Sequence, residues 1–100
     1  MAKLARFFPD ATAVRIPVRV TRLRASASAP AETTVIEFGT FREVIFSSAQ
    51  ELEFEDRIRV ENSDGSLDAE AEIVAMQLHD GKTAVAARFL NNVTNWIIKK

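Results

Sequence analysis

The sequence contains no cysteine, which excludes disulfide bonds, thiolate nucleophiles and thiolate metal sites. This composition suits a reducing compartment, so a cytoplasmic location is expected. Histidine is almost as scarce, since His79 is the only one and stands at the start of a turn-forming segment. One imidazole without clustered partners is a poor ligand set for a transition metal. We therefore expect no metal site and no resident cofactor.

Glycine is also scarce, and the three glycines, Gly39, Gly65 and Gly81, stand far apart. A phosphate-binding loop needs several glycines within a few residues, so none is predicted. Alternating carboxylates do occur in residues 51–55 and 68–72. Rows with this spacing are typical of the wet outer face of a sheet, whereas an acid/base pair needs a cleft with two unequal environments. The chain is not expected to be an enzyme.

Long apolar runs are absent, so neither a signal peptide nor a membrane span is predicted. Tyrosine is absent too, and most phenylalanines fall inside apolar patterns, which leaves few exposed rings for stacking nucleic-acid bases. A nucleic-acid polymer is therefore not expected as a partner. With 47% hydrophobic residues in 100, the composition is that of one globular domain rather than a disordered chain.

The net charge of −1 conceals a division along the chain. Residues 1–24 hold six basic residues against Asp10 alone, residues 25–80 hold thirteen acidic residues against three arginines, and residues 81–100 add four basic residues. If the two ends meet in the fold, they form one positive surface that attracts a phosphate-bearing ligand. Otherwise these charges are solvated strand faces.

Strand patterns dominate the sequence. Residues 14–20 carry apolar side chains at every even position, with Arg15, Pro17 and Arg19 between them, which is the period of a half-buried strand. Pro17 places this strand at an edge or at an unpaired position. Further strands are predicted at residues 33–38, 41–46, 57–61, 67–78 and 83–90.

The connections carry turn chemistry at three places. Residues 62–66 and 79–82 contain Asp-Gly and predict two overlapping hairpins, while Gly39 predicts a turn or a bulge. Residues 24–31 predict a flexible loop, and residues 47–56 a loop anchored by Leu52 and Phe54.

Short strands separated by regular turns favour a small closed antiparallel barrel of six strands, because closure removes exposed edges. We expect an N-terminal arm at residues 1–12 and a single barrel domain at residues 13–100. Residues 93–100 predict a last strand or a short C-terminal helix, with Trp96 as a plug at one end of the barrel.

The order of these segments resembles the PilZ domain family. The resemblance covers roughly residues 13–98 and rests on the spacing of the strands and on the closing Val-Ala-Ala-Arg-Phe segment at residues 85–89. It implies a six-stranded barrel, often with a C-terminal helix. It also implies either a bacterial receptor for cyclic di-GMP or a non-binding relative that works through protein contacts.

In PilZ domains that bind the ligand, an Arg-x-x-x-Arg element precedes the first strand and an Asp/Asn-x-Ser-x-x-Gly element follows the second. The resemblance nominates six ligand-binding positions in this chain: Arg6, Arg15, Arg19, Glu37, Gly39 and Arg42. Both elements depart from the family pattern. The Arg15–Arg19 pair lies within the first predicted strand, and Glu37, Gly39 and Arg42 replace the Asp/Asn, Ser and Gly.

Two functions remain open at this point. The favoured one is a PilZ-like module of cyclic di-GMP signalling with eroded ligand motifs, which acts through a protein partner. The alternative is a cyclic dinucleotide receptor that uses the basic N-terminal region, because arginines bind phosphates through two parallel hydrogen bonds and stack on guanines.

Overall fold

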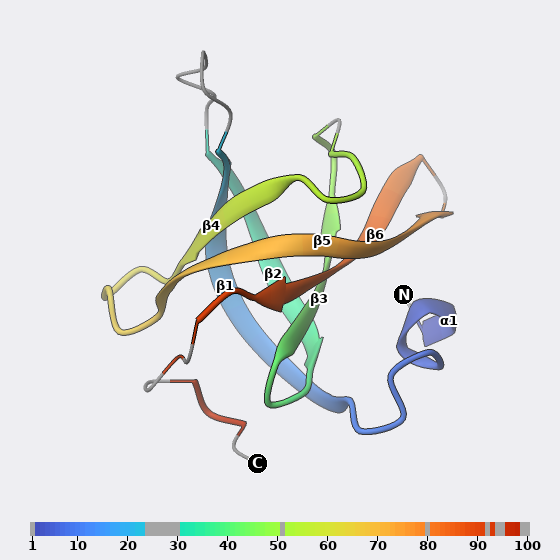
Figure 1. Ribbon diagram of the computed structural model, residues 1–100, viewed down its shortest axis with the longest axis horizontal. Coiled ribbons are helices and arrows are strands. Elements are labelled where there is room, and N and C mark those ends of the chain that lie inside the picture. Colours follow the sequence, from blue (N-terminus) through green and yellow to red (C-terminus); the bar gives the residue numbers. More distant parts are fainter. Residues whose placement is uncertain are drawn as a thin grey trace.

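Six strands form a closed antiparallel barrel in the computed structural model, which describes residues 2–23, 31–50, 52–79, 81–91, 93 and 96–98 (Figure 1). The strands follow one another around the barrel in the order β1-β2-β3-β6-β5-β4, and a single helical turn precedes them. This confirms the predicted fold class. The elements are α1 (Ala2–Ala5), β1 (Thr12–Arg22), β2 (Glu32–Gly39), β3 (Glu43–Ser48), β4 (Arg57–Glu61), β5 (Asp68–His79) and β6 (Lys82–Phe89).

Strand β1 shows why the sequence folds this way. Val18 and Val20 point into the core and are buried, whereas Arg15, Pro17 and Arg19 are exposed, as the alternation predicts. The ladder with β2 runs along most of β1, but the ladder with β4 covers only Arg19 to Arg22. Pro17 therefore lies where β1 has one neighbouring strand instead of two, so its missing N–H is tolerated.

Inward-facing side chains from all six strands fill the barrel, and burying them supplies the main driving force for folding. The largest fully buried ones are Phe46, Ile36, Ile58, Ile73, Val20, Val44, Val60 and Val85. A half-buried ion pair between Arg22 and Asp56, 3.2 Å apart, ties the β3–β4 connection to the last residue of β1. It stabilises the place where β1 and β4 close the barrel.

Both predicted hairpins are present. Gly65 and Gly81 have φ angles of 77° and 79°, in the left-handed region that glycine adopts without strain. Strand β5 serves both hairpins as one continuous strand, and a bulge between Ile73 and Ala75 shifts its register against β6. The loop predicted for residues 24–31 lies outside the described residues except at Ala31.

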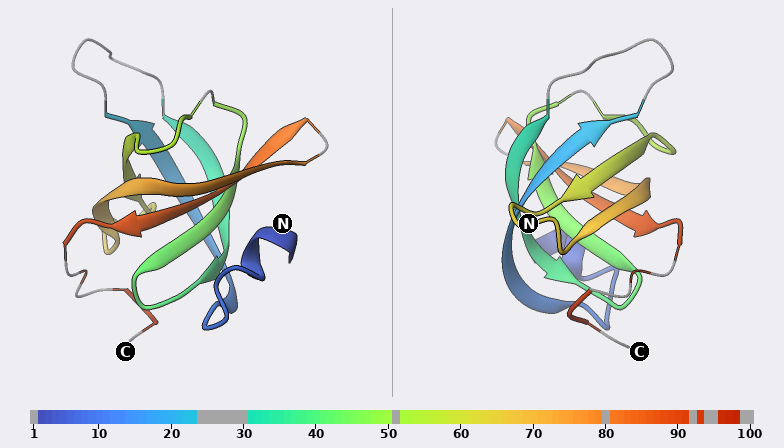
Figure 2. Two further views of the ribbon diagram at one scale, coloured as in Figure 1. Left: turned by 45° about the vertical axis from the view of Figure 1, so that its right-hand side comes forward. Right: turned by 90° about the vertical axis from the view of Figure 1, so that its left-hand side faces the viewer.

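The N-terminal residues pack against the outside of the barrel. Leu4 in α1 is buried against Ile45 of β3 and against Ala84 and Ala86 of β6. These two alanines face outward, and their small side chains let the helical turn approach the sheet. Figure 2 shows α1 beside the β5–β6 hairpin. The residues predicted as an arm therefore cover part of the barrel wall.

Two expectations need correction. Leu52 is buried as an anchor of the β3–β4 connection, but Phe54 is 60% exposed and anchors nothing in the core. The described residues at the C-terminus, 93 and 96–98, form neither helix nor strand. Residues 96–98 lie away from α1 (Figure 1), whereas α1 packs on the outer face of β6, which also carries Lys82 and Arg88, so the described parts of the two basic ends meet there. In the described part of the chain, no helix is long and apolar enough to cross a bilayer.

Candidate functional site

Gly39 ends β2 and lies under the indole ring of Trp96. A Cβ atom at Gly39 would stand 2.7 Å from Cζ2 of that ring, so only glycine leaves it enough room. Trp96 is 2% exposed and its indole N–H donates to the carbonyl oxygen of Thr40 at 2.7 Å. Gly39 is thus a packing position, neither a turn nor a bulge, since the bulge in β2 falls between Ile36 and Phe38. The expectation that Trp96 plugs the barrel is confirmed.

Arg42 lies in the tight turn between β2 and β3. The Thr40 hydroxyl oxygen accepts hydrogen bonds from the backbone N–H groups of Arg42 and Glu43, and the Arg42 carbonyl accepts from the N–H of Phe89. These bonds fix the Arg42 backbone while its side chain stays exposed.

Arg15 and Glu37 lie opposite each other across β1 and β2. The register shift between Ala13 and Ile16 places Val14 and Arg15 against Glu37, and both charged residues are exposed. The fold therefore brings together two of the six nominated positions, one of each sign.

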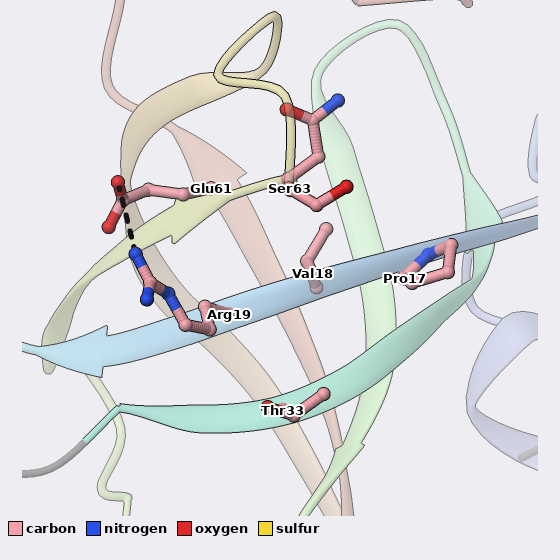
Figure 3. A pocket seen from close by; sticks show the side chains of 7 residues that line it. Pro17, Val18, Arg19, Thr33, Glu61 and Ser63 are labelled. Atoms are coloured by element: carbon pink, nitrogen blue, oxygen red, sulfur yellow. Dashed lines mark ion pairs between the residues drawn. The ribbon is translucent and has the colours of Figure 1, made fainter.

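Arg19 lies on the same outer face of β1 as Arg15, four residues further along, which corresponds to about 13 Å. It borders a hollow of about 330 Å³ that opens where β1 and β4 diverge (Figure 3). The lining residues are Pro17, Val18, Arg19, Thr33, Glu61, Asn62 and Ser63. The Arg19 guanidinium stands 3.9 Å from the Glu61 carboxylate and keeps 62% of its side chain exposed.

Arg6 directly follows α1 on the barrel wall, and its side chain is exposed. The apolar cluster under this segment comes from β2, β3, β5 and β6, with Phe8 and Phe38 among its members. Arg6 therefore belongs to a different part of the wall from the hollow beside Arg19.

These positions define the chemistry available to a ligand. Arg15 and Arg19 are far enough apart on one strand face to bind two separate anionic groups, because each guanidinium binds one phosphate through two parallel hydrogen bonds. Arg19 stands beside the Glu61 carboxylate, which competes with an incoming anion, and Arg15 lies across the strands from Glu37. Binding of a cyclic dinucleotide by the six nominated residues stays a prediction.

Acidic side chains on the outer wall are paired with arginines across the strands. Arg59 of β4 makes two hydrogen bonds of 2.8 Å to the Asp68 carboxylate of β5. Arg88 of β6 lies 3.0 Å from Glu43 of β3. The row at residues 68–72 is therefore a solvated sheet face on which acidic and basic side chains pair. The row at residues 51–55 was also expected on a sheet face, but its described residues lie in the β3–β4 connection, outside any strand. Among the described residues, no group of three or more acidic or histidine side chains could hold a metal ion.

The Arg59–Asp68 pair gives a pH-dependent prediction. The hydrogen bonds from Arg59, helped by its positive charge, hold the pKa of Asp68 below its ordinary value of 3.8. The resulting stabilisation is fully present above the pKa of the unfolded chain and is lost as pH falls through the lower, folded value. In an NMR titration of side-chain carboxyl carbons, Asp68 should titrate below pH 3.8.

Arg59→Gln should return the Asp68 midpoint to its ordinary value. Arg57→Gln is the matched control, because Arg57 lies on the same strand face but stands opposite Glu72. An Asp68 midpoint that does not respond to Arg59→Gln, or responds equally to Arg57→Gln, would contradict the assignment.

Of the seven residues that line the hollow, the sequence nominated only Arg19. The Asn62 side chain accepts from the N–H of Leu67 and donates to Ser66, which holds the β4–β5 turn in place beside the hollow. The available signal was the turn chemistry of residues 62–66, but only the β1–β4 register brings that turn to Arg19.

Comparison with protein-family models, with curated proteins and with solved structures found no match.

Proposed function

We propose that this chain is a PilZ-like module of bacterial cyclic di-GMP signalling that acts through protein contacts. The observation that carries the proposal is a complete six-stranded barrel in which only one of the six nominated ligand positions, Arg19, lines the hollow. Gly39 packs under Trp96, Arg19 faces Glu61, and Arg6 lies on another part of the wall. A high-affinity dinucleotide site needs these groups free and converging on one concave surface.

Exposed apolar side chains support a role in protein contacts. Phe7, Phe54, Leu78 and Ile97 are each at least 60% exposed. Scattered exposed residues are normal on a monomer, but large apolar and aromatic side chains are also what protein interfaces use as anchors.

The second candidate function is a cyclic dinucleotide receptor. The observation that favours it is the hollow beside Arg19, whose volume of about 330 Å³ falls at the low end of the range for ligand pockets, about 300–1,000 Å³. In this function one ligand phosphate replaces Glu61 as the partner of Arg19, and the other binds Arg15.

Isothermal titration with cyclic di-GMP at moderate salt separates the two functions. The interaction module predicts no saturable heat at ligand concentrations up to about 100 µM, whereas a receptor saturates in the range of about 1 µM. If heat does saturate, the double variant Arg15→Glu, Arg19→Glu should abolish it. Thr12→Glu is the matched control, since Thr12 is an exposed residue of the same strand.

The protein-contact role is tested by affinity capture from lysate of the host, with the immobilised chain as bait. A specific partner is one that an excess of the free chain competes away. Failure to capture any competed protein, together with saturable binding of cyclic di-GMP, would replace the proposed function with the receptor.

A further inference from the structure

The second half of β5 has one edge that no described strand covers, here called the free edge. Strand β4 pairs with β5 only from Asp68 to Glu72, and the backbone of residues 55–56 extends this pairing to Ile73. From Val74 to His79, β5 pairs with β6 on one side, and the described residues provide no strand on the other. Figures 1 and 2 show this hairpin projecting beyond the rest of the barrel.

The backbone groups on this edge can be assigned from the register. Ile73 donates its N–H to the carbonyl of Asp56 and accepts from the N–H of Glu55, both at 2.9 Å, so its polar groups point toward the β4 side. Antiparallel ladders alternate this direction from residue to residue, and the bulge after Ile73 shifts the alternation by one. The N–H and C=O groups of Met76 and Leu78 therefore point to the free edge.

The edge lacks the protection that free strand edges usually carry. Charged side chains and proline discourage edge-to-edge pairing, and the singly paired stretch of β1 has both, in Arg15 and Pro17. Residues 74–78 of β5 contain neither. Met76 and Leu78 lie on one face of the hairpin and are 37% and 76% exposed. An unpaired backbone edge of this kind is complementary to another extended strand.

We propose that the occupant of this edge is the same β5 edge of a second copy of the chain, paired antiparallel about a two-fold axis at Gln77. Met76 of each copy then pairs with Leu78 of the other, and the four N–H···O bonds use the backbone groups that the edge exposes. A two-fold axis places identical residues opposite each other, which is unfavourable for a charge. Gln77 is neutral and carries both a donor and an acceptor, so two copies can hydrogen bond to each other.

The interface is small, so the dimer is expected to be weak. Four backbone hydrogen bonds and four apolar side chains fall well below a standard protein interface. We expect a dissociation constant between about 10 µM and about 1 mM. The inference does not depend on the proposed function, because a dimer forms or fails to form whether or not the chain binds another protein.

Sedimentation equilibrium on the full chain, from about 10 µM to about 1 mM, tests the proposal. The wild type should shift from monomer toward dimer with increasing concentration. Gln77→Lys and Gln77→Glu should each weaken self-association at least about tenfold, because like charges meet on the axis. An equal mixture of the two variants should restore it. Gln77→Thr, which is neutral and favours strands, is the matched control and should still dimerise.

Amide hydrogen exchange locates the contact. The N–H groups of Met76 and Leu78 should exchange more slowly at high protein concentration than at low, whereas that of Gln77, which faces β6, should not change. A monomer at every concentration would overturn the proposal, as would a dimer that Gln77→Lys leaves unaffected. Protection of Met76 and Leu78 by a captured partner without self-association would assign the edge to that partner instead and leave the proposed function standing.

Discussion

Replacement of Trp96 by alanine is expected to lower the free energy of unfolding by about 3–5 kcal/mol, the usual cost of removing a large buried aromatic side chain. Trp96 is 2% exposed, and its ring meets Phe89 edge to face with the centroids 5.5 Å apart. The substitution also leaves the buried carbonyl of Thr40 without the indole N–H that it accepts at 2.7 Å. The effect should be large because Trp96 closes the end of the barrel.

Urea denaturation followed by far-UV circular dichroism measures this loss in every variant, including those without tryptophan. Trp96→Phe is the informative control, because it keeps an aromatic ring in place but removes the N–H donor. It should cost about 1–3 kcal/mol, the penalty for an unsatisfied buried acceptor. A midpoint for Trp96→Ala within experimental error of the wild type would show that Trp96 contributes little to the fold.

The barrel was predictable because its signals are local. Apolar alternation assigned the inner and outer faces of β1, since side chains on a strand alternate whatever the strand pairs with. The Asp-Gly pairs marked both hairpins, since Gly65 adopts a backbone conformation that other residues avoid. Each of these features depends on a few neighbouring residues, and the sequence displays them directly.

The misjudged positions depend on contacts between distant segments. Phe54 fits the alternation of residues 51–55, yet it is exposed, because Glu55 has a positive φ angle and the chain turns there. Nothing in the sequence around Ala84 and Ala86 indicates that the helical turn α1 packs against them. Gly39 stands where the sequence predicts a turn or a bulge, but a glycine is needed there because the indole ring of Trp96 packs against it. None of these relations follows from local propensity or period.

The candidate site was likewise predictable only in its local features. The alternation places Arg15 and Arg19 on one outer face, and the structure does the same. The carboxylates beside them, Glu37 and Glu61, come from the β2 and β4 registers, which a bulge and a short ladder determine. An arginine pair within a rigid strand has a fixed spacing and fixed neighbours, whereas a pair on a loose arm can close around a ligand. This difference favours the protein-contact function over the receptor.

Gly39→Ala should lower the free energy of unfolding by about 1–3 kcal/mol, although two effects oppose each other at this site. Gly39 does not have a positive φ angle, so alanine would ordinarily stabilise the fold by about 0.4–1 kcal/mol through the entropy of the unfolded chain. The new Cβ would meet Trp96 at 2.7 Å and Ile98 at 3.0 Å. The Ile98 side chain can move, but the indole ring is fixed by its hydrogen bond to Thr40, so overpacking should dominate.

A double-mutant cycle identifies the cause. In the Trp96→Phe background the smaller ring leaves room for the methyl group, so Gly39→Ala should cost little or become stabilising there. Gly65→Ala is the control for backbone strain, since a Cβ at Gly65 meets open space and only the φ angle of 77° opposes it. Equal costs of Gly39→Ala in both backgrounds would show that Gly39 is not constrained by Trp96. That result would reopen its role as part of a ligand-binding element, because the position would then be free to serve one.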